Sequence, residues 1–431
     1  MNTIIRLVIL LLIPAASYAQ QGWKLCNGPA FGTRVDDIYM VNTQIGYAVC
    51  GDGKIVKTTD GGDNWILLQQ SNNIYYRSVE FMNAQKGFVG GFAFDPNVTT
   101  NILKKTTDGG ATWTDISSLL DPRAKRGICG LAVADSNTIY GCGNWYEDNA
   151  YIVVSNDGGN NWRFIDMSAY ASSIIDMHFI NKAVGFVTGK GPLPLETGVI
   201  LYTTDGGHTW SYVFQNTDPN EYCWKIQRLT PNLYFASLED FGNIAPKILT
   251  STDGGMNWSI QQVDTPQYNI EGIGFINPLK GWTGGAAGYS FESNDGGMTW
   301  DTIHVCPFMN RVFRVNDTLL FASGSSIWKY GNTSFAIPPP IAPEKHYAWM
   351  SCSPNPVNTD LNIDVTIAGP TRVMLTILDH TGMRVKLVEN ADKPKGSYKY
   401  KFNTGQLPPG MYYVLLKTHD DKVLKKIVVT R

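Results

Sequence analysis

The chain has 431 residues, of which 43 are Gly, 22 Pro, 12 Trp and 21 Tyr, so it can bury a large core and needs many tight turns. This composition favours an all-β protein. A formal net charge of -2, with Lys and Arg scattered along the chain, provides no basic face for nucleic acid. Nucleic acid is therefore excluded as a partner.

Residues 1–19 are expected to form a secretory signal peptide. Arg6 precedes an apolar run from Leu7 to Ile13, and small residues follow up to a predicted cleavage point after Ala19. No other stretch approaches the roughly 20 apolar residues of a membrane helix. We therefore expect a mature chain outside the cytoplasm, without a membrane-spanning segment.

An eight-residue phrase, Ser/Thr-x-Asp-x-Gly-x-Thr/Asn-Trp, occurs six times, and we call it the Asp-turn motif. Its aspartates lie 48, 49, 48, 48 and 42 residues apart, a period that suits one four-stranded unit per repeat. The paired aspartates and tryptophans are Asp60 and Trp65, Asp108 and Trp113, Asp157 and Trp162, Asp205 and Trp210, Asp253 and Trp258, and Asp295 and Trp300. Each motif is expected to join the third and fourth strands of its unit.

A predicted β-hairpin precedes each motif. In the first one, Asn42 stands four residues before Gly46, and both residue types favour the tight turn of a hairpin. Weaker copies of this hairpin bring the number of units to seven. The last unit lacks both a motif and a fourth strand, which residues Gly22 to Lys24 could supply beside Ile327 to Tyr330. Such pairing would close a ring and remove two sheet edges. Residues 20–331 are thus predicted to form a seven-bladed β-propeller, with six blades as the alternative.

The repeated aspartates invite comparison with calcium loops. A metal site needs several converging oxygens, whereas each motif offers one carboxylate. A short acceptor such as Asp60 can instead bind backbone N–H groups in a tight turn, Gly62 can adopt a left-handed conformation, and Trp65 can cover the layer between strands. We therefore expect structural motifs, with no metal and no cofactor.

The motif resembles the Asp-box, or bacterial neuraminidase repeat. The Gly-aromatic hairpin followed by the TTDGG run is similar to the seven-bladed photosystem II assembly and stability factor propellers, from Gln21 to about Tyr330. The resemblance implies the fold but no single activity, because this architecture includes glycosidases, assembly factors and binding modules.

A Pro-rich linker, predicted at residues 332–347, should be stiff and extended. Residues 348–431 contain alternating strands expected to fold as a small β-sandwich. They resemble the type A C-terminal sorting domain of the type IX secretion system of Bacteroidetes. The matching residues are Asn355-Pro356-Val357, Asp379 with Gly382, Leu407 before Gly410-Met411-Tyr412-Tyr413, and Lys425 with Lys426. The resemblance implies the type IX machinery as a partner and a secreted or outer-membrane location; an ordinary carbohydrate-binding or immunoglobulin-like sandwich is the alternative.

Seven cysteines leave at least one unpaired. Cys129 and Cys142 flank a predicted hairpin and form the most plausible disulfide. Buried free thiols that pack as small apolar groups are favoured over such a pair.

No catalytic signature is present. The Phe/Tyr-Arg-Ile-Pro phrase of sialidases does not occur, and loop acids such as Glu239 and Asp240 stand in no recognisable pattern. Arg34, Arg77 and Arg311 are among the arginines that could converge, although no pattern requires it. We therefore favour a non-catalytic propeller that binds an extracellular protein or glycan. The alternative is an extracellular glycoside hydrolase, sialidase-like or glucanase-like, with loop carboxylates as catalytic groups.

The candidate ligand-binding residues lie in the loops from strand two to strand three and in the segments between blades. There, aromatic side chains beside Arg and acids suit stacking on sugars or anchoring of a peptide. They are Tyr76, Arg77, Arg126, Trp145, Tyr146, Tyr222, Trp224, Asp240 and Phe241. The alternative is that these aromatics only seal the blade ends.

Overall fold

The computed structural model describes residues 21–95, 97, 99–124, 126–143, 150–194, 196–218, 221–240, 246–263, 269–332, 348–379, 383–418 and 422–430. Their regular secondary structure consists of β-strands and two short 3-10 turns, η1 (Ser117–Leu119) and η2 (Pro122–Ala124). Within these ranges, no helix has the length and apolar character needed to cross a bilayer.

Residues 21–332 contain seven four-stranded antiparallel sheets, each ordered below from its innermost strand outward. The first four are β2 (Val35–Met40), β3 (Gly46–Cys50), β4 (Lys54–Thr58), β5 (Ile66–Gln70); β6 (Ile74–Phe81), β7 (Gly87–Ala93), β8 (Leu103–Thr106), β9 (Thr114–Asp115); β10 (Gly130–Val133), β11 (Ile139–Gly143), β12 (Tyr151–Ser155), β13 (Arg163–Asp166); and β14 (Ser173–Phe179), β15 (Gly185–Lys190), β16 (Gly198–Thr203), β17 (Ser211–Gln215). The remaining three are β18 (Glu221–Arg228), β19 (Tyr234–Asp240), β20 (Lys247–Ser251), β21 (Ser259–Gln262); β22 (Ile270–Phe275), β23 (Gly281–Gly285), β24 (Ser290–Ser293), β25 (Asp301–Ile303); and β26 (Arg311–Asn316), β27 (Leu319–Ser323), β28 (Ile327–Asn332) with β1 (Gln21–Leu25).

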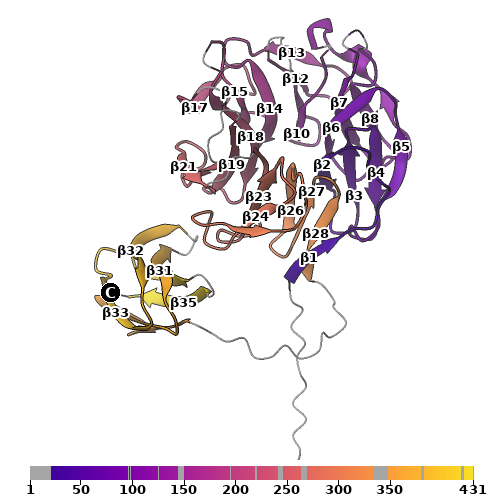
Figure 1. Cartoon of the computed structure of the whole chain (residues 1–431). Helices are drawn as coiled ribbons and strands as arrows, with labels where there is room; N and C mark the ends of the chain where they lie inside the picture. Colours follow the sequence, from indigo (N-terminus) through magenta and orange to yellow (C-terminus); the bar gives the residue numbers. More distant parts are fainter. Residues whose placement is uncertain are drawn as a thin grey trace, which may run out of the picture.

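The sheets are arranged around a common centre (Figure 1). The innermost strand of each sheet contacts the innermost strand of the next, and β26 contacts β2, so the series closes into a ring. Inner strands such as β3 are wholly buried, whereas outer strands such as β5 and β17 are largely exposed. This gradient gives the core its shape, because apolar faces of adjacent sheets bury one another. The predicted all-β propeller fold is confirmed.

The N-terminal strand completes the last sheet, as predicted. β1 runs antiparallel to β28, with Trp23 opposite Tyr330 and Leu25 opposite Trp328. The Trp23 ring also meets Trp282 edge to face, with centroids 5.1 Å apart. One end of the chain therefore pairs with a strand about 300 residues later in the sequence, and the two edges that would otherwise be open are covered.

Hydrogen bonds within each Asp-turn motif hold its own turn. In the first motif, the Thr58 hydroxyl donates to Asp60 at 2.9 Å and accepts from the Gly62 N–H at 2.9 Å. Asp60 in turn accepts from the Asn64 N–H at 3.0 Å and from its side-chain amide at 2.7 Å. Gly62 has a φ of 88° and lies against the ring of Phe321 in the preceding sheet. The turn thus also contributes to packing between sheets.

Residues 348–430 form two further sheets that share one apolar core. One sheet contains β29 (Ala348–Ser353), β30 (Asp360–Ile367) and β33 (Gly396–Asn403); the other contains β31 (Thr371–Asp379), β32 (Arg384–Lys393), β34 (Gly410–Lys417) and β35 (Lys422–Val429). Alternating burial along β30 shows one face turned to the core. The arrangement is sandwich-like.

All seven cysteines are free thiols, and five of them are buried. The disulfide considered for Cys129 and Cys142 is not formed, although the two residues are neighbours: the Cys129 N–H donates to the Cys142 carbonyl at 2.7 Å. Burial raises the pKa of the Cys142 thiol well above its ordinary value, which keeps it protonated.

Candidate functional site

β-bulges bring charged side chains together near the axis of the ring. The register of an innermost strand with its neighbour shifts around Asp36 in β2, Arg77 in β6 and Glu271 in β22. A bulge leaves one residue out of the ladder and turns its side chain in a new direction. These three bulge residues, although separated by up to 235 positions, meet with Arg34 in one group that we call the axial charge cluster.

Short ion pairs hold the axial charge cluster. Asp36 accepts from Arg34 and from Arg77, in both cases at 2.8 Å, and Glu271 accepts from Arg34 at 2.6 Å. Burial alone would lower the pKa of both guanidinium groups. The adjacent carboxylates, together with the Cys129 thiol beside Arg77, outweigh this effect, so the pKa of each arginine is raised. The two guanidinium groups therefore stay charged although they are largely buried.

A third acidic group adjoins the axial charge cluster. Glu239, in β19, is only 2% exposed. Burial raises the pKa of its carboxyl group well above the ordinary value, and the negative charge of Glu271 raises it further. A carboxyl group with a raised pKa beside a second carboxyl group also occurs at sites of acid–base catalysis.

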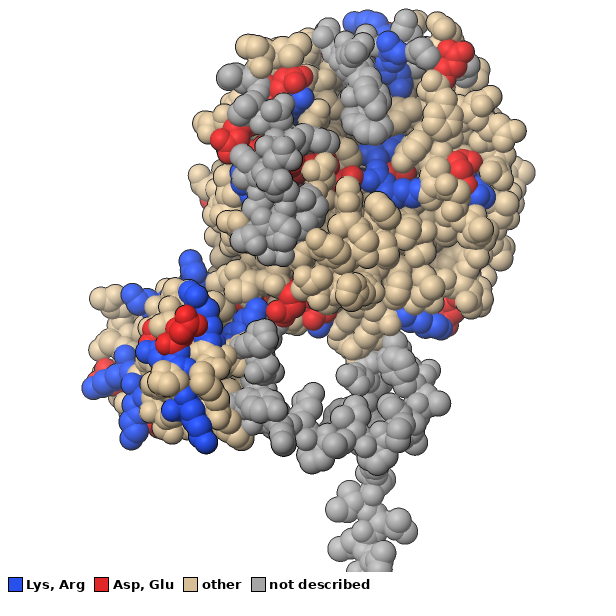
Figure 2. Space-filling view, viewed as in Figure 1, with Lys and Arg blue, Asp and Glu red and all other residues tan. Residues whose placement is uncertain are grey.

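Arg34 is the member of the cluster that reaches solvent. Its side chain is 20% exposed, compared with 1% for Arg77. It donates three hydrogen bonds, through Nε and both terminal nitrogens, and a guanidinium has five N–H donors. Two donors thus have no partner within the described ranges. Figure 2 shows basic side chains near the middle of the ring on the viewed face.

One aromatic residue, Tyr75, lies near Arg34. Burial raises the pKa of the Tyr75 hydroxyl, and the carboxylate of Asp36 adds to this shift, which places the phenol beside the cluster. The ring of Phe94 packs edge to face on Tyr75 at 6.2 Å and is 63% exposed. A large exposed apolar ring of this kind is a feature of binding surfaces.

A second charged layer lies further along the axis. Arg311 is 3.2 Å from Asp37 and 2.9 Å from Asp176, and Lys225 is 3.9 Å from Asp176. Here an axial cavity of about 460 Å³ is lined by residues of several innermost strands, including Arg311 and His178. Burial lowers the pKa of His178 to about 4, so its imidazole is neutral. Among the residues placed in the structure, no three His, Cys, Asp or Glu side chains are grouped as metal ligands.

The predicted ligand-binding residues differ in how deeply the structure buries them. Tyr76 is fully buried, with its hydroxyl donating to Ser71 at 3.1 Å, and Trp224 is 2% exposed, with the Arg77 guanidinium 5.4 Å from its ring centre. The expectation that these two rings are displayed is wrong, because both fill the space between sheets.

The other predicted residues retain some access or cannot be placed. Tyr222 is half-buried, and the Lys190 ammonium lies 4.6 Å from the centre of its ring. Arg126 is half-buried, and Asp240 is 5% exposed. Trp145, Tyr146 and Phe241 lie outside the described residues. Asp36 and Glu271 were missed in the sequence, because a bulge inside an apolar strand has no signature of its own.

The chain was compared with known proteins. Residues 352–430 match the family described as secretion system C-terminal sorting domain. The photosystem II assembly lipoprotein Ycf48 of Synechococcus sp. (strain CC9902) is 24% identical over 284 residues, which cover 62% of this chain and 74% of that protein.

Two solved structures share the fold of the ring. YCF48 bound to D1 peptide superposes with a TM-score of 0.54 at 18% identity, over 74% of this chain and 100% of that chain. The GH74 xyloglucanase from Xanthomonas campestris superposes with a TM-score of 0.54 at 12% identity, over 80% of this chain and 60% of that chain. Residues 352–430 are therefore a secretion-system C-terminal sorting domain, and the residues before them have the β-propeller fold of the Ycf48-like proteins.

Proposed function

We propose that this chain is a secreted or surface-attached propeller that binds an extracellular protein segment carrying a carboxylate, at the mouth of the ring around Arg34. The sorting domain supports export by the type IX machinery. The observation that carries the binding proposal is the partly exposed Arg34, held by Asp36 and Glu271 with two N–H donors left over.

A fixed guanidinium is well suited to a carboxylate ligand. Because Asp36 and Glu271 already hold Arg34 in one orientation, a ligand would not have to immobilise a long flexible side chain. Tyr75 lies near Arg34, and the exposed ring of Phe94, which packs on Tyr75, offers the kind of apolar contact that peptide anchors use. That a propeller of this fold, YCF48, has been solved with a peptide bound adds support.

A glycoside hydrolase is the second candidate, and one observation favours it. Burial and the neighbouring Glu271 raise the pKa of Glu239, and glycoside hydrolysis uses a pair of carboxyl groups, one of them an acid with a raised pKa. Against it, Glu239 is 2% and Glu271 7% exposed, and Glu271 is engaged by Arg34 and Asn310. Glu271 is thus occupied in holding Arg34 and both carboxyl groups are buried, which leaves the binding role as the better explanation.

Peptide binding can be tested with the purified full-length mature chain. Fluorescence polarisation would compare a library of acidic peptides with the same peptides in which Glu and Asp are replaced by Gln and Asn. We expect binding of acidic members, and a loss of at least about tenfold in the Arg34→Gln variant, since a charge-assisted hydrogen bond contributes about 1.5–3 kcal/mol. Leu193→Ala, at a 73% exposed side chain remote from Arg34 in sequence, serves as the control.

The same preparation distinguishes the hydrolase. Sialosides and plant and host glycans would be incubated with the wild-type chain and with Glu239→Gln. Turnover that disappears in Glu239→Gln would replace the binding proposal with the hydrolase. Acidic peptides that bind Arg34→Gln as tightly as the wild type would remove Arg34 from the site.

A further inference from the structure

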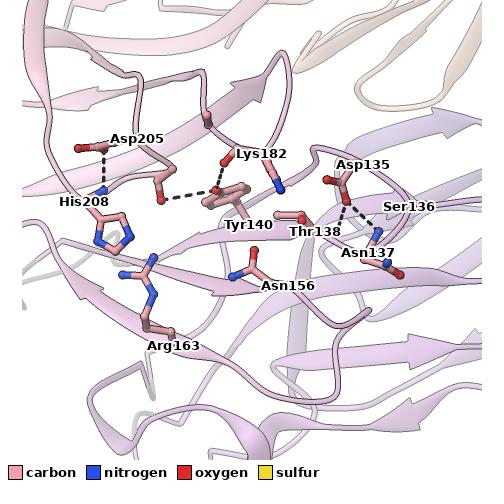
Figure 3. Close-up of a pocket in the computed structure, with 12 residues that line it drawn as sticks. Asp135, Ser136, Asn137, Thr138, Tyr140, Asn156, Arg163, Lys182, Asp205 and His208 are labelled. Carbon is pink, nitrogen blue, oxygen red and sulfur yellow. Dashed lines mark hydrogen bonds between the residues drawn. The ribbon is translucent and has the colours of Figure 1, made fainter.

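A second cavity lies away from the axis, between the third and fourth sheets of the ring. It has a volume of about 610 Å³ and is open between the hairpin turn at Asp135 and the Asp-turn motif of Asp205. Figure 3 shows the side chains of Arg163, His208, Asn156 and Lys182 around it. The function proposed above uses none of these residues.

A lysine brace that is present at three other interfaces of the ring is absent at this one among the described residues. Elsewhere, a lysine in the third strand of a sheet reaches the motif turn of the next sheet: Lys57 Nζ donates to the Gly109 carbonyl at 2.8 Å, Lys105 Nζ to Asn160 at 2.9 Å, and Lys329 Nζ lies 3.2 Å from Asp63. All three lysines stand opposite an aromatic residue of the second strand, namely Tyr47, Phe88 and Phe321.

Val154 occupies this position in the third sheet, opposite Tyr140. Tyr202, Thr250 and Glu292 occupy it in the fourth, fifth and sixth. Val154 is too short to reach the Asp205 turn in the way that the three lysines reach theirs. On its other side Val154 pairs with Arg163, where the first two sheets have Ile66 and Thr114. In this sheet the cationic side chain, Arg163, is therefore on the outer strand, and its guanidinium faces the cavity.

The basic groups at the cavity are available to a ligand. Arg163, Lys182 and His208 are exposed, and within the ranges that the structure describes their side chains form no hydrogen bond or ion pair. The backbone carbonyl of Lys182 accepts a hydrogen bond from the Tyr140 hydroxyl at 2.8 Å. This contact fixes the backbone of Lys182, whereas its ammonium group has no such partner in the part of the chain that the structure describes. The Arg163 guanidinium and the Lys182 ammonium thus have no ion-pair partner among the described residues.

The acidic groups of the cavity limit what can bind. Asp135 accepts from the N–H groups of Asn137 and Thr138, and Asp205 from those of His208 and Thr209, so both carboxylates are fixed in their turns. Hydrogen bonds, chiefly from Thr209, lower the pKa of Asp205 to about 2, so it carries a negative charge at neutral pH. A multiply charged anion such as phosphate would meet these two charges, whereas a ligand with one anionic group and several hydroxyls matches both the donors and the acceptors.

We infer that this cavity, which we call the Arg163 pocket, binds a uronic acid residue of an extracellular polysaccharide. Arg163 and Lys182 contact its carboxylate. Asn156, Ser136 and the outer lone pairs of Asp135 and Asp205 bind its hydroxyl groups. The Arg163 pocket is independent of the site at Arg34, so either proposal can fail without the other.

Isothermal titration of the full-length mature chain tests this inference. The probes are trimers of galacturonate and of mannuronate, their methyl esters, and inorganic sulfate. We expect at least one acidic trimer to bind, its methyl ester to bind at least about tenfold more weakly, and sulfate to bind more weakly than the trimer.

Three variants locate the site. Arg163→Gln should weaken binding of the acidic trimer by at least about tenfold. Val154→Lys should abolish it, because the new lysine would fill the pocket as Lys57 and Lys105 do at their interfaces. Lys399→Gln, at an exposed position of the sorting domain, removes the same charge elsewhere and should change nothing. Thermal unfolding would establish that Val154→Lys is folded.

The inference is overturned by any of three results: neither acidic trimer binds, the methyl esters or sulfate bind as well as the trimers, or Arg163→Gln binds as tightly as the wild type. If Val154→Lys does not fold, Arg163→Gln decides the question alone.

Discussion

The Asp-turn motifs and the axial charge cluster are built on opposite principles. Each motif uses the same residue types six times, and Asp60 forms its bonds with residues at most four positions away. The axial charge cluster uses each residue once, and its bonds join Arg34 to Glu271 and Asp36 to Arg77, across different sheets. The repeat thus builds the individual sheets, and the departures from it give the ring its particular chemistry.

The two regions also differ in how much solvent screens their charges. Asp60 is almost fully exposed, whereas Asp36 is completely buried. A buried ion pair whose partner is removed leaves an uncompensated charge in a poorly solvated place, while an exposed pair is easily replaced by water. Substitutions should therefore have much larger effects at the axis than in the motif turns.

The largest effect is expected for Asp36→Asn. This change keeps the shape of the side chain but removes the charge next to the buried guanidinium of Arg77. Breaking a buried pair should lower the free energy of unfolding by about 3–5 kcal/mol. Urea denaturation, followed by tryptophan fluorescence, measures the loss.

The matched control is Asp317→Asn, in which the acid that pairs with Arg314 is 85% exposed. An exposed pair contributes less than about 1 kcal/mol. Equal losses in the two variants would show that the axial charge cluster is not important for holding the ring together.

An intermediate effect is expected for Gly62→Ala. The φ of 88° is unfavourable for a side chain, and the new Cβ would overlap the ring of Phe321 in the preceding sheet. Left-handed backbone costs about 1–2 kcal/mol and overpacking adds to it, so we expect a loss of roughly 2–3 kcal/mol in urea denaturation.

Gly288→Ala is the control for the glycine substitution. Its Cβ would have no atom within 4 Å and its φ is not left-handed, so the change should stay within about 0.5 kcal/mol. A tolerated Gly62→Ala would mean that the motif turn acts only within its own sheet.

The smallest effect is expected for Asp60→Asn, and it should depend on pH. Hydrogen bonds from the Asn64 N–H and side chain lower the pKa of Asp60 from 3.8 to about 2. A carboxyl group with a lowered pKa in the folded state stabilises the protein above its unfolded pKa and loses this effect as the pH falls through its folded pKa.

The difference in melting temperature between the wild type and Asp60→Asn should therefore be full at about pH 6 and shrink between about pH 4 and about pH 2. Asp108→Asn should follow the same trend, because the Thr112 hydroxyl and N–H lower the pKa of Asp108 to about 2. A difference that stays constant across this range would mean that the charge of the carboxylate does not matter in these turns.

Local features of this protein were predictable from the sequence. The strand that ends at Thr58, the left-handed Gly62 and the pairing of β1 with β28 all follow from residues a few positions apart or from the count of repeats. The sorting domain was predictable for the same reason, since its residues form one continuous segment.

The candidate sites were predictable only in part. Arg77 was singled out, but its partners Asp36 and Glu271 were not, and Tyr76 and Trp224 were expected on the surface although they are buried. Side-chain alternation along a strand cannot locate a bulge, and the bulge decides whether a side chain turns toward the axis or the core.

The sequence by itself therefore determined the kind of unit, its period and the closure of the ring, because short-range turn chemistry and strand alternation act along the chain. Only the tertiary structure decided which charges meet at the axis and that a pocket lies beside Arg163. These contacts depend on how residues far apart in the sequence are brought together when the sheets pack against one another.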